Sequence, residues 1–434
     1  MIDIKLLREN PEEYKQAAKN KNINIDIDRL LELDEKKRKL ITETEKLRAE
    51  RNEISSETKG TKPSQEMIDK SKEIKEKIIQ LEKEAISVEE EYDNLMIKAP
   101  IIPSADTPIC KDETGNVVVK QYGKPKEFKF EPKTHIELAK NLDWIDFERG
   151  VKVAGYRGYF LKNDATRIVM AMMMHAINKM TAKGYTPMIV PTIVKEFALF
   201  GSGYFKGKEY NSEVDEIYQI ATSDKEADGT LSKEKKFLVG TAEPSLLAYF
   251  SGEVLKEEDL PIRVCGFSPC YRSEIGGYGK DTKGLYRVHE FFKVEQVIIS
   301  KADIEESDKL QQEMVAISRS IHEDLEFTYR QVQICTGDMS AGKYKQFDLE
   351  TWLPGSKRWA ETGSASNFLD WQARRLNIKY VTKDGEKKYV YLLNDTALPS
   401  PRPLMAIMEN YQQKDGTIKV PKILQKYIGI KKIG

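Results

Sequence analysis

The sequence is poor in cysteine and histidine, with only four of each among 434 residues. The cysteines have no C-x-x-C spacing and lie at Cys110, Cys265, Cys270 and Cys335. Neither a disulfide framework nor a structural zinc site is therefore expected, and a reducing, cytoplasmic location is the default expectation.

Long apolar runs are also missing. No stretch approaches the roughly 20 apolar residues that span a membrane, so we expect no membrane association. The first five residues, MIDIK, lack the apolar segment of a secretory signal, and their early acid argues against a mitochondrial transit peptide.

The chain carries no excess of charge, because 70 basic residues balance 70 acidic ones. No overall field draws it to nucleic acid, so any such contact must come from a local patch. A chain of this length predicts two or three domains, each with its own core.

The first hundred residues have a helical pattern. Asn10 and Pro11 mark a helix start, as cap and first helical residue. Apolar residues then recur every seven positions on two segments joined by a Gly/Pro turn at 59–63. They are Leu33, Leu40, Leu47 and Ile54 on the first, and Met67, Ile74, Leu81, Val88 and Leu95 on the second, with Ile78, Ala85 and Tyr92 at the complementary position. We predict an antiparallel helical hairpin.

This hairpin is highly charged, and its two helices differ in sign. Acids crowd the second helix near 89–91. Basic residues concentrate on the first helix, at Lys36, Lys37, Arg38, Lys39, Lys46, Arg48 and Arg51. The simplest interpretation is a solvated surface of paired charges, but a one-sided arm could also grip a phosphate backbone. Charge alone leaves a dimerising or spacer coiled coil open as well.

A proline-rich linker, APIIPSADTP at 99–108, ends the helical part, and strands and helices mix beyond it. We predict a hairpin turn at 114–116 before three valines. Asn163 or Asp164 should cap a helix that ends at Gly184, with its methionines in a core or subunit interface. A strand should then run over 186–194.

The polar segment 222–236 reads as an exposed loop. The stretch 271–295, YRSEIGGYGKDTKGLYRVHEFFKVE, is not a phosphate-binding P-loop, because Lys280 is followed by Asp281 and Glu274 stands where the first glycine belongs. Alternating apolar residues after the glycines predict two strands joined by a loop.

Side chains on this predicted hairpin can converge on one surface. Alternation places Arg272 and Glu274 on one face, and Arg287, Phe291 and Glu295 on one face of the returning strand. Four residues span about 13 Å of strand. The row offers a guanidinium, an aromatic plane and a carboxylate, which suit a phosphate, a flat base and an amine or hydroxyl. A solvent-facing sheet with cross-strand ion pairs would use the same residues.

Three other segments favour a binding site. Thr241 and Glu243 share a face if their strand continues, and could hold an ammonium group. Glu361 and Ser364 are hard oxygen donors that suit Mg²⁺ beside phosphates. Arg402 stands at a helix N-terminus, whose dipole already favours anions.

Together these segments resemble a known family. Residues 270–296 closely resemble motif 2 of the seryl-tRNA synthetases, which are class II aminoacyl-tRNA synthetases, and GTAE at 240–243 resembles their serine-binding TxE loop. KLLRENPE, the charged hairpin, KVAGYRGYFLKNDATRI, SNFLDWQARR and IMENYQ follow in the family's order. The resemblance implies an α+β fold, an antiparallel sheet flanked by helices and preceded by a coiled-coil arm. It assigns 1–105 to a tRNA-binding arm and 106–434 to the catalytic domain.

The resemblance also implies the reaction and the residues that serve it. The serine carboxylate attacks the α-phosphorus of ATP, and the seryl-adenylate then acylates the 3′ end of serine tRNA, with Mg²⁺ as cofactor. Catalytic roles fall on Arg272, Glu274 and Arg402. ATP binding falls on Arg272, Ser273, Glu274, Arg287, Val288, His289, Glu290, Phe291, Glu361, Thr362, Gly363, Ser364 and Arg402, with Mg²⁺ on Glu361 and Ser364. Serine binding falls on Thr241, Ala242, Glu243, Arg272, Glu295 and Thr396, and tRNA binding on the seven basic arm residues.

Individual roles follow by similarity. Arg272 would hold the α-phosphate and Arg287 the outer phosphates, while Phe291 and Arg402 would cover the two faces of the adenine. Glu295 and Thr396 would recognise the serine hydroxyl. The family is homodimeric through motif 1 and also charges selenocysteine tRNA. Motif 3 here lacks the family's usual glycine-rich run, and Gly240 replaces a proline.

Two alternatives keep the same fold. A non-catalytic tRNA-binding paralogue would be expected to lose phosphate-holding arginines, whereas Arg272, Arg287 and Arg402 are all present. A sister class II enzyme for threonine or proline would not account for the N-terminal arm.

Overall fold

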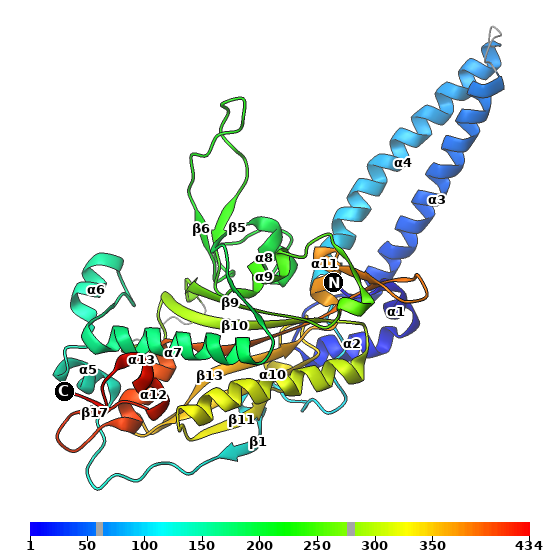
Figure 1. Ribbon diagram of the computed structural model, residues 1–434. Helices are drawn as coiled ribbons and strands as arrows, with labels where there is room; N and C mark the ends of the chain where they lie inside the picture. Colours follow the sequence, from blue (N-terminus) through cyan, green and yellow to red (C-terminus); the bar gives the residue numbers. More distant parts are fainter. Residues whose placement is uncertain (58–63, 276–282) are drawn as a thin grey trace. The chain divides into compact units, whose positions relative to one another are not determined.

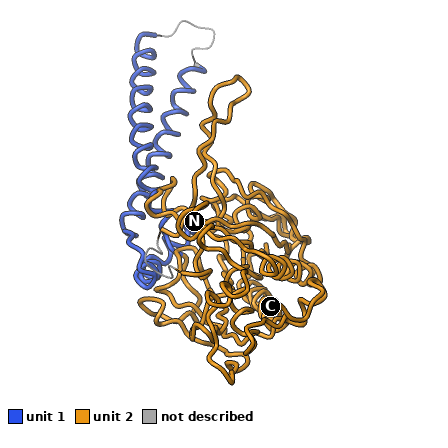
Figure 2. Tube along the Cα trace, turned by 90° about the vertical axis from the view of Figure 1, so that its left-hand side faces the viewer, with its two compact units in different colours: residues 1–100 blue, residues 101–434 orange. Residues whose placement is uncertain are grey.

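The computed structural model describes residues 1–57, 64–275 and 283–434. It divides into two compact units, Met1–Pro100 and Ile101–Gly434, which Figure 2 distinguishes by colour. Among the described residues, no helix combines the length and the apolar character needed to cross a membrane.

The first unit is helical. Its helices are α1 (Ile4–Glu9), α2 (Pro11–Asn20), α3 (Ile27–Glu57) and α4 (Gln65–Lys98), and Figure 1 shows the two long ones running side by side. Pro11 opens α2 as predicted, although the side chain of Asn10 makes no capping hydrogen bond. Leu33 and Leu40 of α3 are buried with Val88 of α4. The heptad prediction is therefore confirmed, while the predicted turn at 59–63 lies outside the described residues.

The second unit is built on an eight-stranded sheet with the order β1-β11-β12-β13-β16-β10-β9-β4. Every pair is antiparallel except β4 with β9, so the predicted antiparallel α+β architecture is confirmed. Its strands are β1 (Val117–Tyr122), β4 (Thr186–Ile189), β9 (Ile262–Tyr271), β10 (Glu290–Ser300), β11 (Tyr329–Gln333), β12 (Lys345–Leu353), β13 (Arg358–Asn367) and β16 (Tyr391–Pro399).

Helices cover both faces of this sheet, as the alternation along β10 shows. Val294 and Ile298 lie in one apolar cluster with α7 (Asn163–Ala182), α10 (Ile304–Asp324) and α12 (Pro401–Tyr411). Val297 and Ile299 lie in a second cluster with α9 (Glu243–Ala248) and α11 (Trp371–Leu376). Because neighbouring side chains of a strand point to opposite faces, the two clusters are the two layers around the sheet.

Smaller elements complete the second unit. The short helices are α5 (His135–Asn141), α6 (Phe147–Ala154), α8 (Glu196–Ser202), α13 (Gln425–Ile428) and the 3₁₀ turns η1 (Glu113–Gly115), η2 (Glu257–Asp259), η4 (Thr336–Asp338) and η5 (Lys422–Leu424). The short strands are β2 (Ile145–Asp146), β3 (Phe160–Leu161), β5 (Ile193–Lys195), β6 (Tyr218–Ile220), β7 (Lys236–Leu238), β8 (Val254–Lys256), β14 (Lys379–Val381), β15 (Lys387–Tyr389), β17 (Ile418–Lys419) and β18 (Lys432–Ile433).

Two local predictions were wrong. The turn at 114–116 is the 3₁₀ turn η1, and β1 pairs with the distant β11 rather than forming a hairpin. The strand predicted over 186–194 breaks into β4 and β5, which belong to different sheets. Pro191 lies in the break, and a proline has no N–H to continue a ladder.

The predicted helix and loop were found. α7 begins at Asn163, so its N-cap is Lys162 rather than the predicted Asn163 or Asp164. Gly184 ends the helix in a left-handed conformation (φ 83°), with the Tyr185 N–H donating to Met180 O over 3.1 Å. Met172 and Met173 are buried, as expected of core methionines. The segment between β6 and β7 is an extended loop that projects away from the sheet in Figure 1.

The linker and the cysteines are held by tertiary contacts that the sequence pattern did not show. The linker backbone is fixed to the second unit, since the N–H groups of Ile101 and Ser104 donate over 2.9 Å to Ala341 O and Tyr344 O. A disulfide joins Cys110 to Cys335. This bond was not expected, because 225 residues separate the two cysteines and only the fold brings them together.

Candidate active site

A cavity of about 580 Å³, counting the part open to solvent, lies where β10, β13, β16 and the start of α12 meet. It gathers residues from four separate segments of the chain. Its lining comprises Arg272, Glu274, Tyr286, Arg287, Val288, Phe291, Lys293, Glu361, Thr362, Gly363, Thr396, Pro399, Pro401 and Arg402. Most of the residues singled out for nucleotide binding therefore share one space.

The paired hairpin is shorter than its pattern predicted. β9 and β10 pair from Tyr271 opposite Glu290, so Arg272 and Arg287 lie just beyond the ends of the strands. The Arg272 N–H still donates to His289 O over 2.9 Å, which keeps the two chains together. Both arginines nevertheless line the cavity.

The charged groups at this end of the hairpin are already in contact. Arg287 Nη1 lies 2.5 Å from Glu274 Oε2, and Glu274 is buried. The guanidinium of Arg272 lies over the Phe291 ring, 5.5 Å from its centroid, and its Nε donates to Gly240 O over 3.3 Å. A ligand that takes Arg287 must therefore compete with Glu274.

Arg402 connects three of the segments that form the cavity. It is the second residue of α12, where the prediction placed it, and its Nη1 donates to Glu361 O over 2.9 Å and to Glu361 Oε2 over 3.2 Å. Its Nε donates to Tyr286 O over 3.1 Å, and its guanidinium lies 4.5 Å from the centroid of the Tyr286 ring. Tyr286 was not among the predicted site residues, because the sequence pattern indicated only an apolar strand position for it.

Glu361 and Ser364 lie on one face of β13 because the pairing register shifts between them. Asp348 pairs with Ser364 and Glu350 pairs with Glu361, and Thr362 has no partner of its own on β12. Glu361 and Ser364, although three residues apart, therefore both lie on the face of Asp348 and Glu350, and a strand without the shift would place them on opposite faces. The register shift therefore places the two predicted oxygen donors, Glu361 and Ser364, on the same face.

The acids of this face differ in ionisation. The Glu361 side chain is 48% exposed, and its partial desolvation would raise its pKa, but the charges of Arg402 and Arg272 outweigh this and hold the pKa below its ordinary value. Burial, followed by the charge of Glu361, raises the pKa of Asp348 to about 7. Glu361 is thus the carboxylate that stays ionised near the cavity.

A second buried cluster lies deeper along β10 and β16. Glu295 pairs with Thr396 across the two strands, and its Oε2 accepts from Thr241 Oγ1 over 3.0 Å and from Thr396 Oγ1 over 3.3 Å. Lys293 Nζ lies 2.6 Å from the same oxygen and 3.3 Å from Thr396 Oγ1. Lys293 was missed by the sequence analysis, although its position two residues before Glu295 on one strand face could have indicated it.

Thr241 and Glu243 do not share a strand face, because β7 ends at Leu238 and α9 begins at Glu243. Glu243 instead accepts from Gln372 Nε2 over 2.7 Å and from Asn394 Nδ2 over 2.6 Å. Burial, followed by the charge of Glu295, raises the pKa of Glu243 to about 7. The strand does not continue through Thr241 and Glu243, so the strand face that they were predicted to share does not exist.

This raised pKa predicts a pH-dependent stability. Because the folded-state pKa lies above the ordinary 4.5, the contribution of Glu243 is full below pH 4.5 and is lost as the pH rises through about 7. The free energy of unfolding should therefore fall with rising pH by up to about 1.4 kcal/mol per pH unit because of Glu243. We expect Glu243→Gln, which keeps an accepting oxygen for Gln372 and Asn394, to remove this part of the fall. Thermal unfolding at pH 5 and pH 7 tests this, and an unfolding midpoint that drops as much in the variant as in the wild type would contradict it.

Several predicted site residues do not line the cavity. His289 Nδ1 lies 2.9 Å from Tyr218 Oη and 2.8 Å from Arg272 O, which is a structural contact. Ala242 is fully buried in the apolar cluster of α9. The others outside the lining are Ser273, Glu290, Ser364, Thr241, Glu243 and Glu295.

On the helical arm, most of the predicted cations have acidic partners. The pairs, at 2.6–3.1 Å, are Lys36–Glu84, Lys37–Glu89, Arg38–Asp34, Lys39–Glu35 and Arg48–Glu82. Ion pairs between exposed side chains contribute only about 0–1 kcal/mol, so the cations with exposed partners can exchange them at low cost. Arg38 differs, because its partner Asp34 is buried. The pairing is compatible both with a solvated surface and with a surface that binds phosphate.

Comparison with known proteins gives the same assignment for both units. Residues 227–411 match the family described as tRNA synthetase class II core domain (G, H, P, S and T), and residues 1–103 match the seryl-tRNA synthetase N-terminal domain. A solved seryl-tRNA synthetase from Pyrococcus horikoshii, complexed with ATP, is 35% identical with a TM-score of 0.88, over 100% of this chain and 99% of that one. A serine–tRNA ligase from Naegleria fowleri, in complex with AMP, is 31% identical with a TM-score of 0.85, over 100% and 98%.

The antiparallel sheet, with one arginine at the end of β9 and another at the start of α12 facing one cavity, defines a class II aminoacyl-tRNA synthetase. The serine–tRNA ligase of Treponema denticola is 41% identical over all of both chains, and that of Dictyoglomus turgidum is 41% identical over 100% of this chain and 99% of its own. The chain belongs to the seryl-tRNA synthetase family. The resemblance on which the sequence analysis relied is thereby confirmed.

Proposed function

We propose that this enzyme activates L-serine with ATP to seryl-adenylate and transfers the seryl group to the 3′ end of serine tRNA. The observation that carries the proposal is the cavity itself. Its lining joins the Arg272, Arg287 and Arg402 guanidiniums, which suit a triphosphate, to Thr396. The Thr396 hydroxyl donates to the buried Glu295, which lies just outside the lining, and these two groups suit a substrate hydroxyl.

In the first step, the arginines stabilise the charge that moves onto the phosphate oxygens. Arg272 holds the α-phosphate together with the serine carboxylate, so that the carboxylate can attack the α-phosphorus while pyrophosphate leaves. When ATP binds, Arg287 gives up its ion pair with Glu274 and binds the outer phosphates instead. Once ATP is bound, the positioned arginines supply most of the rate in such a transfer, and no protein nucleophile is required.

The adenine occupies the part of the cavity between the hairpin and α12. Phe291 contacts one face of the base and Arg402 the other, with Val288 and Gly363 in the lining beside them. Arg402 is held by Glu361 and Tyr286 before any ligand binds, so little side-chain freedom is lost on binding.

The residues on β13 suit Mg²⁺ bound with ATP. Glu361 and Ser364 share a strand face and offer hard oxygens, and Glu361 stays ionised. Two protein ligands suffice, because Mg²⁺ keeps waters and substrate phosphates in its shell. Glu361 and Ser364 would hold the ion there, and it would supply positive charge beside the phosphates.

Serine is selected by polar groups that need a hydroxyl partner. The Glu295 carboxylate accepts from the hydroxyl of the substrate, and Thr241 and Thr396 fix its orientation. Alanine has no hydroxyl to donate to Glu295 and is strongly rejected, whereas threonine is excluded only by its extra methyl group. The ammonium group is placed near Thr241 and Glu243.

The arm of the first unit is proposed to bind the tRNA through α3. We expect the triple change of Lys46, Arg48 and Arg51 to alanine to raise the KM for serine tRNA about tenfold and to flatten its salt dependence, because fewer phosphates are neutralised. Serine-dependent pyrophosphate exchange should not change. The matched control replaces Lys72, Lys75 and Lys83 of α4 by alanine, and an equal effect of the two triple variants would contradict the assignment to α3.

A homodimer is proposed from apolar side chains that stay exposed around α7 and β4. Ile189 is 89% exposed and Ile193 is 55% exposed, with Met170 and Met174 nearly half exposed. Light scattering should give twice the mass of the chain, and Ile189→Asp should shift the protein toward the monomer. A wild-type monomer that still charges tRNA would overturn this proposal.

The transfer step is tested by charging purified serine tRNA with labelled serine. Removal of the long variable arm of that tRNA should abolish charging but leave pyrophosphate exchange intact. Selenocysteine tRNA serves as a second substrate in the same assay, and we expect it to be charged. The enzyme is placed in the cytoplasm, where its tRNA is used.

A further inference from the structure

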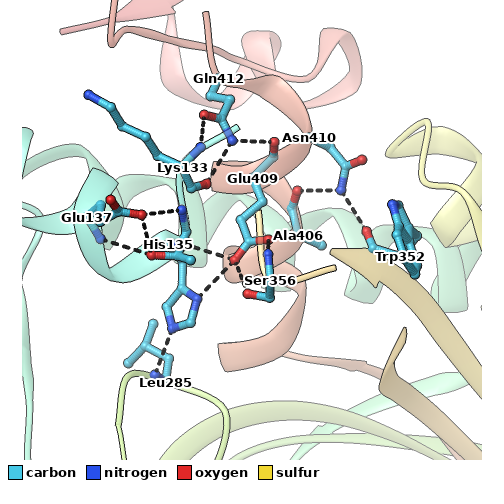
Figure 3. A network of polar contacts seen from close by, with 11 residues as sticks. Lys133, His135, Glu137, Leu285, Trp352, Ser356, Ala406, Glu409, Asn410 and Gln412 are labelled. Carbon is cyan, nitrogen blue, oxygen red and sulfur yellow. Dashed lines mark hydrogen bonds and ion pairs between the residues drawn. The ribbon is translucent and has the colours of Figure 1, made fainter. Parts of the chain in front are cut away.

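A buried carboxylate lies behind the cavity, on the helix that carries Arg402. Glu409 of α12 is fully buried and accepts four hydrogen bonds. Its Oε1 accepts from the His135 N–H over 3.0 Å, from the His135 ring over 3.1 Å and from Ser356 Oγ over 2.7 Å, and its Oε2 accepts from the Ser356 N–H over 2.9 Å. Figure 3 shows these contacts converging on Glu409.

The other ring nitrogen of His135 fixes which tautomer is present. The Leu285 N–H donates to His135 Nε2 over 3.4 Å, so Nε2 must be unprotonated (Figure 3). Nδ1 then carries the proton that is donated to Glu409. The imidazole thus connects the carboxylate of α12 to the backbone at Leu285.

That backbone leads directly into the nucleotide cavity. Tyr286 follows Leu285, lines the cavity, and accepts from Arg402 Nε through its carbonyl. Arg402 and Glu409 are seven residues apart on α12, so they lie on one side of the helix. The segment 285–286 is therefore held to α12 at two points, by Arg402 directly and by Glu409 through His135.

The imidazole is packed closely against this segment. A Cβ placed on Gly284, whose φ is +75°, would lie 2.2 Å from His135 Nε2. A side chain at this position would therefore displace the ring, and glycine alone leaves it room. His135 itself is buried and does not line the cavity.

We infer that His135 is a positioning residue for ATP. It accepts the Leu285 N–H so that Tyr286 stays against Arg402, and Arg402 is thereby aligned to cover the adenine. This inference rests on the proposed function, since it assigns the nucleotide to the same cavity.

Two substitutions separate the two bonds of the ring. His135→Asn keeps an N–H near the position of Nδ1 and loses the acceptor for Leu285, whereas His135→Gln places an amide near Nε2 and loses the ring bond to Glu409. We expect His135→Asn to raise the KM for ATP in serine-dependent pyrophosphate exchange about tenfold, with the KM for serine within twofold of wild type. His135→Gln should recover most of the ATP affinity.

The outcomes separate this role from simple stabilisation. A structural role alone would lower the unfolding midpoint of both variants and leave the KM for ATP unchanged, which would overturn the inference. Equal rises in the KM for ATP and the KM for serine would also overturn it. If the wild-type enzyme shows no serine-dependent exchange, the proposed function fails and this inference fails with it.

A measurement on the wild-type enzyme does not depend on the folding of any variant. The chain has only four histidines, so ¹⁵N-histidine spectra can be assigned by single substitutions. We expect His135 to show the Nδ1-protonated tautomer, and an Nε2-protonated ring would overturn the inference.

Discussion

Replacement of Glu295 by alanine is expected to lower kcat/KM for serine in pyrophosphate exchange about 10³-fold, while ATP affinity changes by less than about threefold. The carboxylate is buried and accepts from Thr241 and Thr396, so its loss leaves these hydroxyls, the Lys293 ammonium and the substrate hydroxyl without their common acceptor. The ATP side of the cavity is lined by other residues and should be little affected.

Exchange kinetics with serine and ATP varied separately provide the measurement. Glu305→Ala is the control, because Glu305 is an exposed carboxylate in the first turn of α10. Unchanged serine kinetics in the Glu295 variant would remove this residue from the serine site.

Arg272→Lys is expected to lower kcat for pyrophosphate exchange about 10²- to 10³-fold. Lysine keeps the charge, but it cannot present the planar fork that binds two phosphate or carboxylate oxygens at once, and it loses the contact with the Phe291 ring. The loss should fall mainly on kcat, because the charge on the α-phosphate grows in the transition state.

Arg263→Lys is the matched control for this change. Arg263 lies on the same strand, β9, and pairs with Glu313 at 3.0 Å. The kcat values of the two variants in pyrophosphate exchange should differ at least about 10²-fold, and a similar kcat in both would contradict the role given to Arg272.

The arm and the nucleotide residues could be predicted because their signals are local. A seven-residue apolar repeat dictates the packing of α3 on α4 whatever the rest of the chain does, and Leu33, Leu40 and Val88 are buried accordingly. Arg272, Phe291 and Arg402 were identified from strand alternation and from a helix start, and all three line the cavity. The resemblance to a family supplied their roles.

What could not be predicted depends on contacts between distant segments. A register shift brings Ser364 to the strand face of Glu361, and the sequence around these residues contains no signal of that shift. Glu243 does not continue the strand pattern because α9 starts there, and Cys110 meets Cys335 only in the folded chain. His135 precedes Leu285 by 150 residues, so no spacing rule connects them.

The most direct test of the account is amino-acid-dependent pyrophosphate exchange with each of the twenty amino acids in turn. The cavity predicts exchange with serine far above the rest, with threonine the strongest competitor and alanine nearly inactive. Exchange driven best by another amino acid, or by none, would contradict the assignment of Glu295 and Thr396 to the serine hydroxyl.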